Sequence, residues 1–276
     1  MFQVGPIKWI VLLLLSSGAH AESAPYYLRH QNPFLQVFGL PAPEGGGITG
    51  KGLLDYSFVL TVANHADSGR KVNEEVRLDG ESYYAALVFR YGLRERWEVG
   101  IDLPFIRHDD GVLDNVIEGW HDTFGLSNRK REGPDNQLAF IYRRNGLEEF
   151  AMRDPVSGIG DVRLTVARQI SNGDDDGRSV ALRAQLKLPT GNADRLLGSG
   201  AADISLAADA TDSATLGEYR IVLFGQLGVL GLGHGDLLPH QQQDIVSFAS
   251  GGLAWQWTDR IEIQAQVAFQ DPYFDS

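Results

Sequence analysis

The chain has 276 residues, no cysteine and a formal net charge of −12 at neutral pH. The lack of cysteine excludes disulfides, thiol nucleophiles and thiolate metal sites. The acidic balance argues against a nucleic-acid partner. No linker or change of composition divides the chain after Gly52, so we expect a single domain.

The first 21 residues have the pattern of a secretory signal peptide. Lys8 precedes an apolar run, residues 9–15, and small residues form a cleavage site at residues 19–21. This run is too short to cross a membrane as a helix, and no later segment approaches the roughly 18 apolar residues that a membrane helix requires. We therefore expect residues 1–21 to be removed on export.

Residues 22–51 are predicted to form an N-terminal arm. Four prolines exclude a central strand here. Two interpretations remain: a loose arm, or an arm docked in the mouth or interior of the domain. Docking is favoured, because the apolar side chains between Phe34 and Leu40 are costly to leave in water.

The domain proper, residues 52–276, begins with an alternating strand at residues 53–63 and a polar loop at residues 64–81. The hairpin at residues 83–105 then places apolar and polar side chains on opposite faces. A soluble sheet also alternates, but each limb has about the 9 to 11 residues of a tilted membrane strand, with aromatic residues at its ends. Together with two later tryptophans, the predicted interfacial aromatic residues are Tyr83, Tyr91, Trp97, Phe105, Trp255 and Trp257.

A long extracellular loop is predicted at residues 106–159. It contains an amphipathic helical stripe formed by Leu113, Val116, Ile117, Trp120 and Phe124. The stripe is interpreted either as a loop helix that caps the mouth or as a lid that gates or contacts a ligand. A short alternating piece at residues 137–143 is predicted to be a strand beyond the membrane.

Six further strands are predicted at residues 162–168, 180–188, 204–210, 219–229, 244–257 and 261–269. In residues 244–257 the faces do not separate, and a bulge that switches the register midway would explain this. The predicted fold is an all-β, antiparallel transmembrane β-barrel with about nine strands. Because bacterial barrels have an even strand number and no open edge, we expect a complete parent of 12 strands.

Charged side chains predicted to face the lumen are Asp55, Arg90, Glu98, Asp102, Asp161, Arg163, Arg183, Lys187, Arg220 and Glu262. Acids and bases are balanced, whereas an ion-selective pore has one dominant sign. The balance indicates ion pairs that brace a narrow barrel, or a polar conduit for a small amphipathic solute.

An enzyme is not expected, nor is a cofactor or a metal site. The alternative is a lipid hydrolase of the outer membrane that uses His108, His121 or Ser127, with a cation at residues 174–176. No GxSxG or HExxH spacing supports it, and a nucleophile needs a base within hydrogen-bond reach.

Several motifs carry a family resemblance: NPFLQVFGLP at residues 32–41, the segment 110–131, GIGD at 158–161, LKLPTG at 186–191 with LGSG after it, and PYFDS at the end. They resemble an uncharacterised outer-membrane family of Gram-negative bacteria, a domain of unknown function. GIGD and LPTG are also distantly similar to outer-membrane barrels associated with meta-pathway phenol degradation.

The resemblance implies a barrel in the outer membrane of a Gram-negative bacterium, with outer-membrane lipids and the insertion machinery as partners. The expected function is passage or gating of a small apolar or amphipathic solute. The alternative is a structural or assembly-partner barrel without transport.

Overall fold

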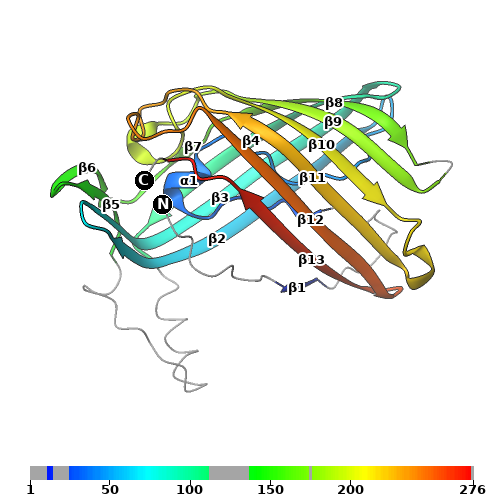
Figure 1. Ribbon diagram of the computed structural model, residues 1–276, viewed down its shortest axis with the longest axis horizontal. Helices are drawn as coiled ribbons and strands as arrows, with labels where there is room; N and C mark the ends of the chain where they lie inside the picture. The colour runs from blue at the N-terminus through cyan, green and yellow to red at the C-terminus, as the bar shows by residue number, and fades with distance from the viewer. Residues whose placement is uncertain (1–10, 15–24, 112–136, 174–175, 275–276) are drawn as a thin grey trace, which may run out of the picture.

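The computed structural model describes residues 11–14, 25–111, 137–173 and 176–274 (Figure 1). Thirteen strands in this part of the chain form one antiparallel sheet. Helical structure in the same residues is limited to α1 (Pro33–Gln36) and the 3-10 turns η1 (Ala193–Arg195) and η2 (Gly217–Tyr219). The predicted all-β antiparallel class is therefore confirmed. Within the described ranges, no helix has the length and apolar character needed to cross a membrane.

Nine long strands pair with their neighbours in chain order and form a curved wall. They are β2 (Leu54–Arg70), β3 (Glu74–Arg94), β4 (Trp97–Asp109), β8 (Arg163–Asn172), β9 (Arg178–Lys187), β10 (Asp203–Asp212), β11 (Ile221–Gly231), β12 (Ile245–Thr258) and β13 (Ile261–Gln270). These nine correspond to the nine predicted strands. The sheet is not closed, because β2 pairs with β3 and not with β13.

Four shorter strands extend this wall. The hairpin of β5 (Ala139–Arg144) and β6 (Leu147–Met152) pairs with the outer part of β3, and β7 (Val156–Ile159) pairs with β4. The strand β1 (Val11–Leu14) pairs with β13. Much of the described part of the predicted loop, residues 106–111 and 137–159, is thus strand, and the expected strand at residues 137–143 is present as β5.

The wall has two unlike ends (Figure 1). At the turn end, short connections join β3 to β4, β8 to β9, β10 to β11 and β12 to β13. At the loop end lie α1, the hairpin β5–β6, β7 and the C-terminal segment. Residues 64–81 are predicted as a loop, but residues 64–70 and 74–81 form the outer parts of β2 and β3 at this end. Ion pairs such as Arg70 with Glu75 hold this polar extension together.

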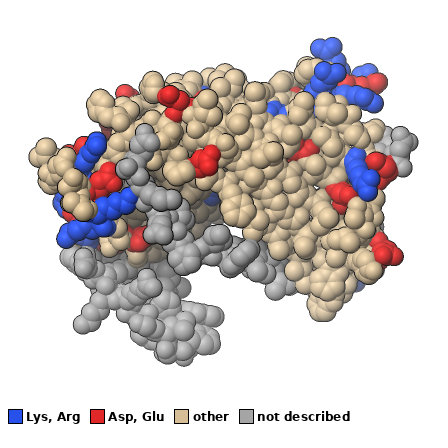
Figure 2. Space-filling view, viewed as in Figure 1, with Lys and Arg blue, Asp and Glu red and all other residues tan. Residues whose placement is uncertain are grey.

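Side chains alternate along the second half of β3, from Ser82 on, and along β4. Positions 83, 85, 87, 89 and 91 face outward, while positions 84, 86, 88 and 90 are buried, and β4 repeats the pattern. The faces predicted for residues 83–105 are confirmed. The outward face is strongly apolar: on β2, Tyr56 and Phe58 are 74% and 65% exposed. Figure 2 shows charged side chains gathered near the two ends, with few over the middle.

Residues 244–257 do not switch register midway, which corrects the expected bulge. Leu253, Trp255 and Trp257 point outward, while Val246, Phe248 and Ala254 are buried inside. The one irregularity in the pairing of β12 with β13 lies at its end, between Gln256 and Thr258. The faces did not separate in the sequence because the inner face of β12 is itself apolar, where it packs on a core at the loop end.

Candidate functional site

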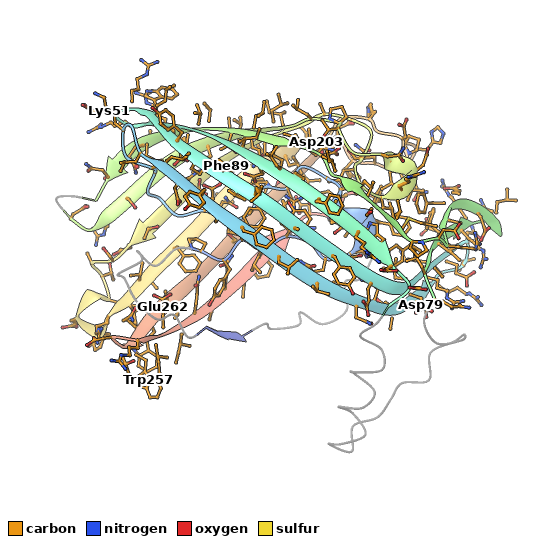
Figure 3. All side chains as sticks on the ribbon, turned by 180° about the vertical axis from the view of Figure 1, so that it is seen from behind. Lys51, Asp79, Phe89, Asp203, Trp257 and Glu262 are labelled. Carbon is orange, nitrogen blue, oxygen red and sulfur yellow. The ribbon has the colours of Figure 1, made fainter. Side chains whose placement is uncertain are left out.

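The arm runs through the interior from the loop end to the turn end. Its helix α1 lies at the loop end, where the Asn32 side chain accepts a hydrogen bond from the backbone N–H of Phe34 (2.9 Å). At the turn end Lys51 forms a parallel bridge with Gly92. Figure 3 shows Lys51 and Asp79 at opposite ends of the wall that the arm lines. Of the two alternatives for the arm, the structure shows the docked one.

Glu44 is the arm's main electrostatic contact with the wall. Its two carboxylate oxygens lie 2.7 Å from Nη2 of Arg90 and 3.0 Å from Nε of Arg183. These guanidiniums also pair with wall carboxylates, Arg90 with Asp102 (2.6 Å) and Arg183 with Asp209 (2.8 Å). The arm thus supplies the central acid of a five-residue network that joins β3, β4, β9 and β10.

The glycine run after Glu44 lies flat against the wall. Arg183 donates hydrogen bonds to the carbonyls of Gly45 and Gly47, both at 2.7 Å. The N–H of Gly46 donates to Oγ1 of Thr211 (2.9 Å). A Cβ on Gly46 would lie 2.1 Å from the carbonyl oxygen of Ser179, so no larger residue fits there. Close approach of two backbones explains this glycine.

A second buried charge cluster surrounds Lys187, whose side chain is fully buried. Its Nζ lies 2.8 Å from Asp161 and 3.0 Å from Asp203. Nζ also donates to the carbonyl of Val37 in the arm (3.3 Å), and Asp203 accepts from the N–H of Gly39 (2.8 Å). The arm therefore has polar contacts with the wall at both clusters.

At the loop end the arm packs into an apolar core. Phe38 is fully buried and its ring lies 5.0 Å from that of Tyr273 and 5.6 Å from that of Phe274. Other buried members of this core are Phe34, Val37, Leu78, Leu138, Phe140, Tyr142, Met152, Leu196, Leu230, Leu232, Val246 and Phe248. Burial lowers the pKa of the neighbouring arm residue His30 to about 4.

Two cavities border the described residues. A cavity of about 10 Å³ borders Glu44, Arg183 and Gln226, which is about the space of one water probe. A larger cavity of about 480 Å³ lies at the loop end beside Arg77, Arg143 and Arg153. There, hydrogen bonds from Arg153 and Arg143 lower the pKa of Glu148. Beside the smaller cavity the arm lies against the inner face of the wall, through Glu44, Gly45 and Gly47.

Seven of the ten predicted lumen residues are buried inside the wall: Arg90, Glu98, Asp102, Asp161, Arg163, Arg183 and Lys187. The prediction that Arg220 faces the lumen is corrected. This residue follows η2 at the turn end and pairs with the exposed Asp259 (2.8 Å). Asp55 lies opposite Arg90 in the register but is exposed, because β2 is an edge strand of the open sheet. Glu262 is partly buried near the turn end (Figure 3).

Sequence reasoning missed the interior residues Glu44, Asp203 and Asp209. Glu44 lies in a stretch without periodicity, so no local signal could have placed it. Asp203 and Asp209 could have been predicted from strand alternation, since they share the odd-numbered inner face of β10 with Ser205 and Ala207. Extending the predicted strand by one residue would have found Asp203.

The aromatic residues predicted at the interface lie on the outward face. Tyr91, Trp97, Trp255 and Trp257 are near strand ends, whereas Tyr83 and Phe105 lie within β3 and β4, because these strands extend beyond the predicted limits. Tyr91, Phe105, Trp255 and Trp257 are exposed by 41%, 49%, 38% and 56%. Tyr83 and Trp97 are partly buried. The guanidinium groups of Arg94 and Arg168 lie 5.9 and 5.6 Å from the Trp97 ring, at the turn end.

Of the histidine and serine candidates, the structure describes His108. Its Nδ1 lies 2.9 Å from Oγ of Ser82, which lies 2.9 Å from Nε2 of His65. Ser82 is only 3% exposed, so this chain of hydrogen bonds joins β2, β3 and β4 beneath α1. Asp176 accepts from the N–H of Arg178. Among the residues with described positions, no His, Cys, Asp and Glu cluster could hold a metal.

Other predicted residues lie outside the described residues. These are the lid candidates Leu113, Val116, Ile117, Trp120 and Phe124, together with His121, Ser127, Asp174 and Asp175.

Comparison with known proteins gives one family. A family model described as "Protein of unknown function (DUF3187)" matches residues 6–276. No curated protein matches the chain. The expected membership of a family of unknown function is thus confirmed, while this match carries no information on phenol degradation.

Proposed function

Because the chain belongs to the DUF3187 family, whose function is unknown, we propose a role from its own geometry. It is an outer-membrane β-barrel protein through which a small apolar or amphipathic solute passes when the N-terminal arm leaves the interior. The arm is the gate. The observation that carries the proposal is the position of Glu44 between Arg90 and Arg183, inside the wall.

Membrane insertion is supported by the outward face of the wall. Large apolar side chains are exposed along β2, and the same face continues over the other long strands. Such an extended apolar surface is costly in water and is what lipid covers in a transmembrane barrel. Residues 1–21 are proposed to be the signal peptide, so their removal frees the edge of β13 that β1 occupies.

Gating is supported by the way the arm is held. A carboxylate buried in a low-dielectric interior is stable only while its charge is compensated. Glu44 satisfies this condition through two arginines, each of which keeps a second carboxylate partner when Glu44 leaves. The network therefore tolerates two states, with the arm docked or released.

The solute class follows from the interior surface. Acids and bases are paired across it, so no single sign dominates the path. The wall side of the apolar core, which includes Phe140, Val246 and Phe248, lines the loop end. A small molecule with an apolar body and one polar group suits both surfaces. The similarity to phenol-degradation barrels noted in the sequence points to the same class.

A second candidate function is a structural or assembly-partner barrel without transport. It is favoured by the extent of arm packing, since the Lys187 cluster and the Phe38 core make the arm part of the fold. In that case the arm never leaves. The two functions differ in what release of the arm does to permeation. No enzymatic role is proposed.

Glu44→Gln tests the gate. Loss of the charge-assisted contacts weakens docking by about 2 kcal/mol, which raises the undocked population about thirtyfold. Uptake of radiolabelled benzenesulfonate, a permanently ionised amphipathic solute, is measured in proteoliposomes of the full chain. We expect uptake to rise about tenfold or more over the wild type.

Glu95→Gln is the matched control, because Glu95 is exposed at the turn end and pairs only with exposed Lys51 in the described contacts. Its uptake is expected to equal that of the wild type. Uptake by Glu44→Gln at the level of protein-free liposomes would contradict gated passage and favour the structural barrel.

A further inference from the structure

We propose that Arg29, Arg163 and Tyr273 form a binding site for the carboxylate of an amphipathic monoanion, whose apolar body rests against Phe38 and Phe274. This inference rests on the proposed function and names the class of solute. It joins three separate segments: the arm, the start of β8 and the segment after β13.

The two guanidiniums converge on Tyr84. The Cζ of Arg29 lies 5.3 Å from the centre of its ring, and Nη1 of Arg163 lies 3.4 Å from its hydroxyl. Tyr273 reaches this cluster through Phe38, which contacts both Tyr273 and Arg29. Arg29 also donates through Nη2 to the carbonyl of Phe38 (3.3 Å), whose ring contacts Tyr273.

These residues hold several buried donors without a hydrogen-bond acceptor in the described part of the chain. They are Nε and Nη1 of Arg29, Nε of Arg163 and the hydroxyl of Tyr273. Arg163 and Tyr273 are each only 2% exposed. Buried donors in native proteins are nearly always satisfied, and a planar carboxylate fits the fork of an arginine.

The surrounding charges select a monoanion. Asp102 lies opposite Arg163 in the pairing of β4 with β8, and Asp203 accepts a hydrogen bond from the N–H of Gly39, the residue after Phe38. A dianion such as a phosphate monoester would place its second charge near these two carboxylates. The aromatic rings of Phe38 and Phe274, 5.6 Å apart, provide the apolar side of the site.

The site can be reached without breaking the wall. Arg29 precedes the first long strand, and Tyr273 follows β13, which ends at Gln270. The hydrogen bond from Gln243 N–H to the carbonyl of Tyr273 (2.8 Å) and the bridge of Phe274 with Gln242 hold that segment. Movement of the segment after β13 admits a ligand from the loop end while the docked arm and the pairs between the long strands stay in place.

The test is isothermal titration calorimetry of the full chain in detergent with benzoate, and with benzyl alcohol as the neutral analogue. The wild type is expected to bind benzoate and to bind benzyl alcohol at least tenfold more weakly. Arg163→Gln is expected to weaken benzoate binding by about ten- to a hundredfold, since one charge-assisted fork is lost. Arg220→Gln, at an exposed arginine, is the matched control and should leave it unchanged.

Tyr273→Phe removes one hydroxyl and keeps the ring, so it tests the site even if Arg163→Gln fails to fold. A severalfold loss of benzoate affinity is expected. Equal affinity of both variants and the wild type, or no benzoate binding by the wild type, would overturn the site. If benzoate does not bind but Glu44→Gln still takes up benzenesulfonate, the binding site is refuted and gated passage is not. Benzoate binding without any uptake would instead keep the site and refute passage.

Discussion

Replacing Lys187 by methionine is expected to lower the free energy of unfolding by about 3 to 5 kcal/mol, because two buried carboxylates then lose their counter-ion. Asp161 and Asp203 lie 2.8 and 3.0 Å from Nζ, and all three side chains are at most 1% exposed. Methionine is of similar size, so the loss is one of charge. Urea unfolding in detergent, followed by tryptophan fluorescence, measures it.

Lys51→Met is the control, since Lys51 is 63% exposed and its partner Glu95 is 85% exposed at a distance of 3.6 Å. Its effect is expected to stay below about 1 kcal/mol. Adding Asp161→Asn and Asp203→Asn to Lys187→Met should restore part of the loss, because the uncompensated charges are then removed. A Lys187→Met protein as stable as Lys51→Met would show that the cluster is not a paired buried site.

Gly46→Ala is expected to force the arm away from the wall. Its new Cβ would lie 2.1 Å from the carbonyl oxygen of Ser179 and 2.8 Å from the backbone nitrogen of Thr211. Neither backbone atom can yield without disturbing the pairing of β9 with β10. We expect solute uptake to increase at least as much as in Glu44→Gln, and the arm to become accessible to protease.

Gly47→Ala is the neighbouring control, because a Cβ there meets nothing within 4 Å. Both substitutions change the backbone freedom of the unfolded chain in the same way. Any difference in uptake or protease resistance between the two variants therefore results from the contact of residue 46 with β9 and β10. Equal uptake and equal protease resistance for the two variants would argue that the arm does not lie against β9 in solution.

The strands of the wall could be predicted from the sequence, because the alternation of apolar and polar residues is a local pattern. Period-two alternation placed the long strands other than β12, and both faces of residues 83–105. It failed at residues 74–81, where Glu74, Glu75 and Asp79 gave the appearance of a loop. In the structure these residues extend β3, where they pair with β2 and β5. Pairing between residues distant in sequence produces no local sequence pattern, so it could not be predicted.

The interior was readable only in part. Wall residues such as Arg90 and Asp102 follow from strand parity, and they face each other within the wall at 2.6 Å. The arm has no period, so its path and the partners of Glu44 are set by contacts distant in sequence. The sequence left a loose arm and a docked arm as alternatives, and it did not predict the close backbone contact that requires glycine at residue 46.

The most direct test of the central claim, that the arm must leave the interior for solute to pass, is a reversible covalent lock. The chain has no cysteine, so Gly45→Cys with Thr211→Cys introduces one pair. A Cβ on residue 45 lies 3.0 Å from Oγ1 of Thr211, a separation compatible with a disulfide between the arm and β10.

The measurement is benzenesulfonate uptake by proteoliposomes of this double-cysteine protein in the Glu44→Gln background, before and after reduction. Thr211→Cys alone is the control, and its uptake should not respond to reductant. We predict uptake near the level of protein-free liposomes in the oxidised state and a return to the fast Glu44→Gln rate on reduction. Equal, fast uptake in both states would contradict the arm as the gate.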